Sequence, residues 1–510
     1  MPIFSIIFLF ILIWIFVRYT TSKKRFLALF SLTVVLQTYY FQGYFIQIGA
    51  QGISSCEGMS LKLLVLYSLW LLFSGKVRPK RNVYVGAMFC FMFLFGSILY
   101  ETFVPFDGLL LPHMGEDTDG TMYGWDALVA GTATMVSYQP PLQELVRKST
   151  YFFYYVFILV AFKEVFDFES FTRTLMSIVK WGKLCIYYGL FEFFLKNIMG
   201  QLTFTYDLAQ VLFGVNGMAV QTVAYSKGGN WYTLQGFTSE PAHFVIYLFT
   251  VAFFMILAGV CQKRCLELGI YVKRTFYPFE IFLSVLLMFL CGGFSAVWMS
   301  SLLLVVSIIV YIRSRHISLW HWIRKYQLAV LGVVVIGMAL GFVILNNDYY
   351  VGRLQDMLYI LAFLQPGNLD ITGMLGVVGA GGNEGIHSTV ARLGSIAYGI
   401  EICLERPLFG IGPGTLWVFD TIITLWLYYG ILALLAVYYL LTRSRFGLRY
   451  DHFLLFTLIV IGGFPMNLNV QNLSLSYIVF AEASAIYLLR VESISKQEKE
   501  MLMGESPDKT

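Results

Sequence analysis

The sequence predicts an all-α integral membrane protein, and three observations carry this prediction. Hydrophobic residues make up 58% of the 510 residues, whereas charged residues make up 13%. That apolar share exceeds the share in ordinary soluble domains. Apolar runs recur at the length that a helix needs to cross a bilayer. Lys and Arg gather in short segments between alternate runs, as they do in multi-pass proteins.

Apolar runs of membrane-spanning length define about thirteen expected transmembrane helices. Their centres lie near residues 9, 35, 68, 91, 157, 186, 251, 285, 304, 337, 432, 459 and 482. The first run, in residues 1–25, carries its basic residues after its apolar core, which is the reverse of a secretory signal peptide. We therefore expect a retained first helix with the N-terminus outside.

Basic segments set the expected orientation of these helices. They are residues 18–25, 76–81, 262–274, 313–325 and 443–449. All of them fall on one side of the membrane when the helices are numbered as above, and the positive-inside rule makes that side cytoplasmic. Residues 1–492 then form one transmembrane domain, and residues 493–510 form a cytoplasmic tail. Three longer segments face outward: residues 101–148, 199–241 and 347–421.

Several classes of function find little support in the sequence. The seven cysteines lie mostly in or beside apolar runs, without paired spacing in loops, so no disulfide framework is expected. The net charge of +5 is no nucleic-acid signature, and no nucleic-acid partner is expected. Asp117 and Asp119 in "GEDTDG" form a D-x-D pattern that could hold a divalent cation. A solvated acidic turn explains the pattern more simply, so we expect no metal and no cofactor.

The stretch "GFTSEPAHF" (236–244) places an acid, a proline and a histidine at the start of an apolar run. Ser239, Glu240 and Pro241 suit the first turn of a helix, as a cap, a charge that complements the helix dipole and an N-terminal proline. In the functional alternative, Glu240 and His243 lie one helical turn apart and line an outward-facing cavity. The carboxylate could then act as a base.

The third outward segment begins its "TVARLGSIAYGIEICLERPLFGIGPGT" (389–415) with the spacing of an amphipathic helix. Its apolar stripe consists of Val390, Leu393, Ala397, Ile400 and Leu404. Three glycines follow in a segment that cannot continue the helix: Gly410, Gly412 and Gly414. Glycines at these positions allow a tight loop whose amides could bind an anionic group.

Two arginines of the same segment, Arg353 and Arg392, suggest phosphate binding. Each could instead extend toward lipid headgroups, as isolated arginines at a membrane interface do. A guanidinium group offers paired donors in a fixed geometry and stays charged, so two of them on one side of a membrane favour a diphosphate ligand. Glu482, near the middle of the last apolar run, is a further functional candidate, because an acid is costly there. Helix-packing hydrogen bonds near "MNLNVQNLS" are the alternative.

The order of these features resembles the O-antigen polymerase and O-antigen ligase superfamily of bacterial membrane glycosyltransferases. The resemblance covers residues 232–430. It rests on "GFTSEPAHF", on the close helix pair across "CGGFSAVWMSS" (291–301), on the long outward loop with its arginines and glycines, and on "DTIITLWLYYG" (420–430).

The resemblance implies an oligosaccharide carried by undecaprenyl diphosphate at the outer face of the bacterial cytoplasmic membrane. In such an enzyme Arg353 and Arg392 would neutralise the departing diphosphate, and Glu240 would orient or deprotonate the attacking hydroxyl. Membrane lipids and a chain-length regulator protein are the further partners implied. The expected substrate-binding residues are Lys227, His243, His387, Asp420, Gly410, Gly412 and Gly414.

Two departures from the family pattern refine this expectation. Ser295 is followed by Ala296, where the family often has arginine, so that cation is missing or comes from elsewhere, such as Lys227. Ligases commonly carry His-Asn where this chain has Asp420 and Thr421, and this difference favours a polymerase. A ligase-type transferase remains an alternative. So does a flippase or exporter of the same lipid-linked sugars, which needs charged residues along a path across the membrane.

Overall fold

The structure is a computed structural model, and the residues that it describes lie mainly in helices. The described residues are 3–39, 44–48, 51–110, 136–137, 140–213, 231–238, 241–270, 277–291, 384–413, 415–416, 418–442 and 473–488, with scattered positions between 296 and 369.

Long apolar helices dominate these residues. Five are long and apolar enough to cross a membrane: α3 (Cys56–Phe73), α4 (Arg81–Phe103), α6 (Leu142–Val165), α9 (Pro241–Glu267) and α17 (Thr421–Thr442). Shorter apolar helices are α1 (Ile3–Arg18), α10 (Pro278–Leu290) and α19 (Ser476–Leu488). The remaining helices are α2 (Ser22–Tyr39), α7 (Phe168–Asn197), α8 (Phe204–Phe213) and α16 (Glu384–Glu405). Helices of this kind indicate a multi-pass membrane protein.

The expected helix positions agree with the structure wherever it describes the chain. The centres near residues 9, 35, 68, 91, 157, 186, 251, 285, 432 and 482 all fall inside helices. Near the expected centre at 304, residues 299–303 and 305 are helical, whereas the centres near residues 337 and 459 lie outside the described residues. The number of transmembrane helices therefore stays a prediction.

Short strands add a detail to the expected all-α class. They form three antiparallel hairpins: β1 (Tyr44–Ile48) with β2 (Gln51–Ser55), β3 (Leu109–Leu110) with β4 (Val136–Ser137), and β5 (Leu364–Gln365) with β6 (Asn368–Leu369). In the first hairpin Ile46 pairs with Ile53. The four two-residue strands, β3 to β6, carry too little alternation to be predicted from sequence.

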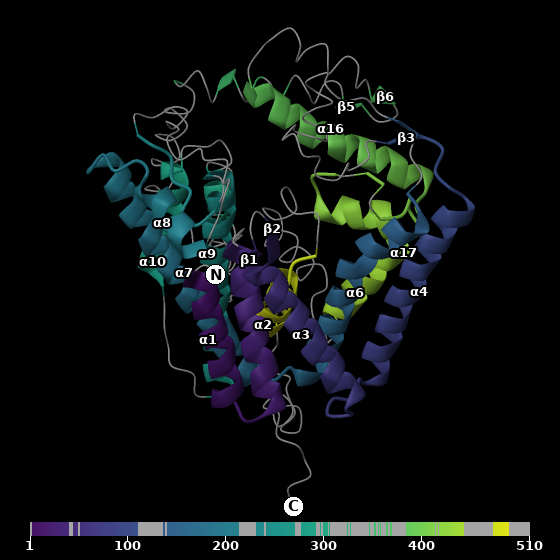
Figure 1. Cartoon of the computed structure of the whole chain (residues 1–510), viewed down its shortest axis with the longest axis horizontal. Helices are drawn as coiled ribbons and strands as arrows, with labels where there is room; N and C mark the ends of the chain where they lie inside the picture. The colour runs from purple at the N-terminus through teal and green to yellow at the C-terminus, as the bar shows by residue number, and fades with distance from the viewer. Residues whose placement is uncertain are drawn as a thin grey trace, which may run out of the picture.

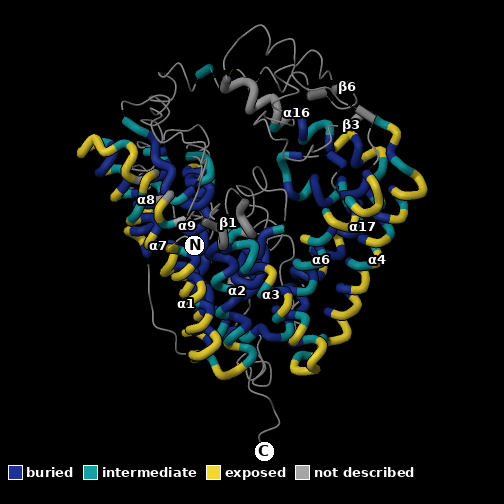
Figure 2. Tube along the Cα trace, in the orientation of Figure 1, coloured by how far each residue is buried: buried dark blue, intermediate teal, exposed yellow. Residues whose placement is uncertain are grey.

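The helices pack side by side, and α16 crosses one end of the molecule (Figure 1). α9 is enclosed by other helices. In its most apolar 18-residue stretch, 83% of the residues are buried, whereas the corresponding share in α4 is 39%. The outward faces of α1 and α4 are exposed (Figure 2) and carry large apolar side chains such as Trp14 and Phe95. An exposed apolar surface of this extent is suited to contact with lipid.

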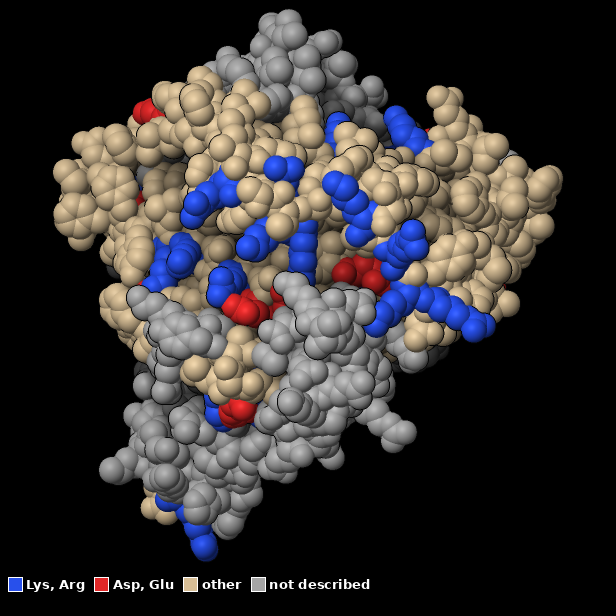
Figure 3. Space-filling view, turned by 90° about the horizontal axis from the view of Figure 1, so that it is seen from below, with Lys and Arg blue, Asp and Glu red and all other residues tan. Residues whose placement is uncertain are grey.

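The basic turns lie together at the end of the molecule opposite α16. Lys23, after the α1–α2 turn, forms an ion pair of 3.1 Å with Asp167 in the α6–α7 turn. The backbone nitrogen of Lys80, in the α3–α4 turn, donates to Glu164 Oε1 at 2.8 Å. Seen from this end, Lys and Arg side chains gather over the surface (Figure 3). The basic segments 18–25 and 76–81 therefore share one face, as their charge predicts.

The end of α9 joins the same face, because Cys265 Sγ lies 3.4 Å from Thr172 Oγ1 near the start of α7. Segment 443–449 lies outside the described residues, and in segment 313–325 the described position is Arg324. Which side of the membrane this face meets stays a prediction.

Glu482 has a structural partner close to the basic face. Its carboxylate forms a buried ion pair with Lys163, near the end of α6. Lys163 Nζ also donates to the backbone oxygen of Leu441, near the end of α17, at 2.8 Å. The pair thus connects α6, α17 and α19, so the structure favours a packing role over the functional role considered for Glu482.

Candidate functional site

The candidate site lies at the end that carries α16, where this helix meets the start of α17. Ser395 Oγ, on α16, donates to the backbone oxygen of Arg392 at 2.8 Å and accepts from the backbone nitrogen of Phe419 at 3.1 Å. A Cβ atom added at Gly399 would lie 2.9 Å from Val418 Cγ2. The absence of a side chain at Gly399 therefore lets α16 approach the residues just before α17.

This junction brings together a cation and an acid that the sequence singled out. The guanidinium carbon of Arg392 lies 5.7 Å from the centroid of the Phe419 ring, a cation–π geometry. The next residue, Asp420, precedes the first turn of α17, and its Oδ1 accepts from the backbone nitrogen of Ile423 at 2.8 Å. Burial raises the pKa of the Asp420 carboxyl and is the largest effect, while hydrogen bonds from the backbone amides of Ile423 and Ile422 lower this pKa by a smaller amount.

The glycine-containing segment after α16 docks on a break in α17. Gly430, inside α17, has a φ of 78° and a ψ of 169°. The backbone nitrogen of Ile411 donates to Leu427 O at 2.7 Å, and that of Ile431 donates to Pro407 O at 2.8 Å. These bonds use backbone groups that the interruption of the helix leaves without helical partners.

Two glycines make this docking possible. An added Cβ would lie 2.1 Å from Leu427 O at Gly410 and 1.8 Å from Leu408 O at Gly430, so neither position accepts a side chain. The backbone nitrogen of Gly410 already donates to Arg406 O at 3.2 Å. The amides of Gly410 and Ile411 thus both donate to carbonyl groups of the chain itself. Close approach of two backbones accounts for Gly410 without a ligand, and its expected role in substrate binding stays a prediction.

Gly412 packs against α4 and α6. Its φ is 82°, and an added Cβ would lie 2.8 Å from Leu145 Cδ2 and 3.1 Å from Glu101 Cγ. Thr415 Oγ1 donates to the Gly412 carbonyl oxygen at 2.7 Å. Contact with two helices accounts for this glycine without a ligand, and its expected role in substrate binding stays a prediction.

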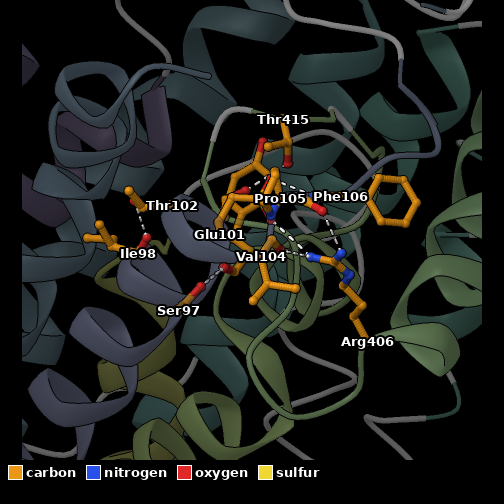
Figure 4. A network of polar contacts seen from close by, with 11 residues as sticks. Ser97, Ile98, Glu101, Thr102, Val104, Pro105, Phe106, Arg406 and Thr415 are labelled. Atoms are coloured by element: carbon orange, nitrogen blue, oxygen red, sulfur yellow. Dashed lines mark hydrogen bonds and ion pairs between the residues drawn. The ribbon is translucent and has the colours of Figure 1, made fainter. Parts of the chain in front are cut away.

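Arg406, which the sequence did not single out, fixes this segment to the end of α4 (Figure 4). Its Nη1 donates to Val104 O at 2.7 Å and lies 3.3 Å from Glu101 Oε2, and its Nη2 donates to Pro105 O at 2.8 Å. Glu101 Oε1 in turn accepts from the backbone nitrogen of Phe106 at 3.1 Å. The Arg406 guanidinium is therefore committed to protein groups.

The start of α9 belongs to the same end of the molecule. α7 begins at the basic face, and its other end contacts Thr233 and Gly236, which lie shortly before α9. Gly236 has a φ of 58°, and an added Cβ there would lie 2.5 Å from Phe244 Cε2. His243 is half-buried in the first turn of α9. The turn before α9 thus packs directly on the helix that follows it.

Several predicted site residues lie outside the described residues: Lys227, Glu240, Arg353 and Gly414. His387 lies within α16, but its side chain is outside the described part. The convergence of Glu240, Arg353 and Arg392 on one cavity therefore stays a prediction. Within the described ranges, no group of three or more His, Cys, Asp or Glu residues could hold a metal ion, whereas Asp117 and Asp119 lie outside these ranges.

Fold and composition together define a helical, multi-pass membrane protein, with polar contacts concentrated where α16, α17 and α4 meet. No protein-family model, no curated protein and no solved structure matches this chain. The family resemblance in residues 232–430 thus stays a prediction based on the order of its motifs.

Proposed function

We propose that this protein is a membrane glycosyltransferase that polymerises oligosaccharide repeat units carried by undecaprenyl diphosphate. It would work at the outer face of the bacterial cytoplasmic membrane and build an O-antigen, a capsule or an exopolysaccharide. The observation that supports the proposal most is the junction of α16 and α17. There Arg392 lies over Phe419, next to Asp420, at the end of the molecule opposite the basic turns.

The proposed reaction joins two lipid-linked glycans. A hydroxyl group of one repeat unit attacks the anomeric carbon at the reducing end of the growing chain. The new glycosidic bond forms as the bond from that carbon to the diphosphate oxygen breaks, and undecaprenyl diphosphate leaves. Glu240 takes the hydroxyl proton, while Arg353 and Arg392 stabilise the negative charge of the leaving diphosphate.

The surroundings of the two described arginines support this division of roles. Arg406 is held by Glu101 and by the carbonyl groups of Val104 and Pro105. Arg392 is half-buried at the junction, on the helix that crosses the end of the molecule opposite the basic turns. The contacts of Arg406 give it a structural role, and we assign phosphate contact to Arg392 because the family resemblance in residues 232–430 implies it. Arg392→Lys would keep the charge but lose the paired donors that fit a phosphate group.

Reconstitution tests the proposal. The purified protein is placed in liposomes with lipid-linked repeat units from a strain that lacks its gene, and the products are separated by size. We expect a ladder of polymers with the wild type and little product with Arg392→Lys. Transfer of the glycan to a different acceptor would favour a ligase. Passage of the lipid-linked unit across the bilayer, without a new glycosidic bond, would favour a flippase.

A further inference from the structure

The end of α7 holds the chain segment that leads into α9. Glu192 accepts from the backbone nitrogens of Gln235 and Gly236, at 3.3 and 2.7 Å. Lys196 lies 2.7 Å from Glu192 and donates to the backbone oxygen of Thr233 at 3.3 Å. Two oppositely charged side chains, one helical turn apart, thus bind both donors and acceptors of one short segment.

Asn197 extends the same set of contacts by one residue. Its Oδ1 accepts from the backbone nitrogen of Tyr232 at 2.6 Å, and its Nδ2 lies 3.3 Å from the Tyr232 carbonyl oxygen. Trp231 Nε1 donates to the backbone oxygen of Leu290 in α10 at 2.8 Å. The segment is therefore fixed through its backbone, much as a strand is fixed by a neighbouring strand. We call Glu192, Lys196 and Asn197 the α7 clamp.

Burying the two charges of the clamp has a large desolvation cost in free energy. The side chains of Glu192 and Lys196 are 0% exposed, so both charges have lost their hydration. Such a pair contributes little net stability, since desolvation offsets much of the attraction. It does require one arrangement of its partners, because any shift of the segment would leave a buried charge or amide without a hydrogen bond. A pair of this kind is better suited to fixing position than to adding stability.

The position fixed by the clamp is the entry to α9. After Gly236 the chain turns, and the backbone nitrogen and Oγ1 of Thr238 lie 3.0 and 2.6 Å from Gln235 O. Phe244, in the first turns of α9, packs where both Gly189 of α7 and Gly236 lack a side chain. Phe244 is thus placed by α7 directly, and Thr238 is placed through Gln235, which Glu192 binds. These two residues lie on either side of the acid-proline-histidine stretch of the sequence.

We propose that the α7 clamp is a positioning element, which sets the start of α9 so that Glu240 and His243 meet the substrate held by Arg392. The effect on turnover rests on the proposed glycosyltransferase function. The mechanical part, in which Glu192 and its neighbours fix residues 232–238, does not depend on it.

A pair of matched variants tests the clamp. Glu192→Gln removes the negative charge of the buried pair at the clamp and leaves Lys196 without its counter-charge. Glu482→Gln removes the negative charge of the buried pair near the basic face and leaves Lys163 in the same situation. Both variants should lower the unfolding temperature. Hydrogen–deuterium exchange of the peptide spanning 232–238 should become faster only in Glu192→Gln, because the amides of Gln235 and Gly236 lose their carboxylate acceptor.

Turnover supplies the second measurement. A shift of about 1 Å in a catalytic group can lower a rate about 100-fold. We therefore expect kcat of Glu192→Gln to fall about 100-fold with a nearly unchanged KM, and kcat of Glu482→Gln to stay near the wild-type value. Equal kcat losses in the two variants would overturn the positioning role, and unchanged exchange of residues 232–238 in Glu192→Gln would overturn the clamp itself.

Asn197→Ala keeps the test open if Glu192→Gln does not fold. It leaves the buried pair intact and removes only the two contacts to Tyr232, so exchange at Tyr232 should become faster and kcat should fall by a smaller factor. Wild-type exchange protection at Tyr232 in Asn197→Ala would overturn the proposal. If the wild-type protein forms no polymer, the proposed function fails, and the exchange measurements alone then decide whether the clamp exists.

Discussion

Arg392 lies in α16 and Arg406 directly follows this helix, yet the surroundings of the two arginines differ. Arg406 contacts one carboxylate and two carbonyl oxygens, and its guanidinium carbon lies 5.4 and 5.2 Å from the ring centroids of Tyr100 and Phe106. Arg392 contacts the ring of Phe419 beside Asp420. From sequence alone both are arginines near a membrane interface. Only the tertiary contacts separate the one that fixes the fold from the one proposed to bind phosphate.

At Asp420 the structure predicts a pH-dependent effect on stability. Burial raises the pKa of its carboxyl above the ordinary value of 3.8. The carboxyl therefore has a pKa near 3.8 in the unfolded chain and a higher pKa in the folded protein. As pH rises from the lower pKa to the higher one, the unfolded chain loses its proton first, so the folded state loses stability relative to it. Asp420→Asn has no such loss and can still cap α17. Its unfolding temperature, relative to wild type, should be higher at pH 7 than at pH 4.

Thermal unfolding of both proteins in one detergent, at a series of pH values, gives this difference directly. The capping contact from the Ile423 nitrogen is the one that the asparagine must preserve. A difference that does not change with pH would show that Asp420 is not the group responsible.

At the scale of elements, the break in α17 organises the contacts at the end of the molecule that carries α16. The interruption at Gly430 lets the segment after α16 donate to and accept from the α17 backbone, and Arg406 then ties that segment to α4. In this way α4 is joined to two elements that lie far from it in the sequence. Hydrophobic periodicity predicts each helix but carries no information on such pairings. The partner of Arg406 is 305 residues away at Glu101, so no local pattern could have revealed it.

Gly430→Ala should therefore destabilise the protein by about 3 kcal/mol, through overpacking added to an unfavourable backbone conformation. Gly75→Ala is the matched control. It has a φ of 69° in the α3–α4 turn but no atom within 4 Å of an added Cβ. That variant should lose only about 1 kcal/mol, from the backbone conformation alone. Unfolding in detergent measures both, and equal losses would mean that the docked segment does not contact Gly430 closely.

At the scale of the whole molecule, the sequence predicted the helical class, the positions of most described helices and the grouping of the described basic turns on one face, but it did not predict α8. These features can be predicted because they depend on the length of each apolar run and on the charge of each turn, both of which are local properties of the sequence. The ion pairs Lys163–Glu482 and Glu192–Lys196 show the limit of that approach. A buried charge in an apolar helix signals a partner, but the partner is found only when the helices are packed.

Orientation in the membrane is tested with two single-cysteine variants. Lys76 lies in the α3–α4 turn and Gln201 follows α7, and both are exposed at opposite ends of the molecule. The seven native cysteines are buried, so they should contribute little background labelling. A membrane-impermeant thiol reagent added outside intact cells should label Gln201→Cys and not Lys76→Cys. The opposite pattern would invert the orientation and remove the outward site.

The central claim is that a lipid diphosphate leaves as each repeat unit is added, and its stoichiometry can be measured. In proteoliposomes with lipid-linked repeat units, the wild type should release one undecaprenyl diphosphate for each glycosidic bond formed. Arg392→Lys should reduce both products together by about 100-fold, in line with the loss of one group that stabilises transition-state charge. Polymer growth without release of undecaprenyl diphosphate, or release unaffected by Arg392→Lys, would contradict the proposed mechanism.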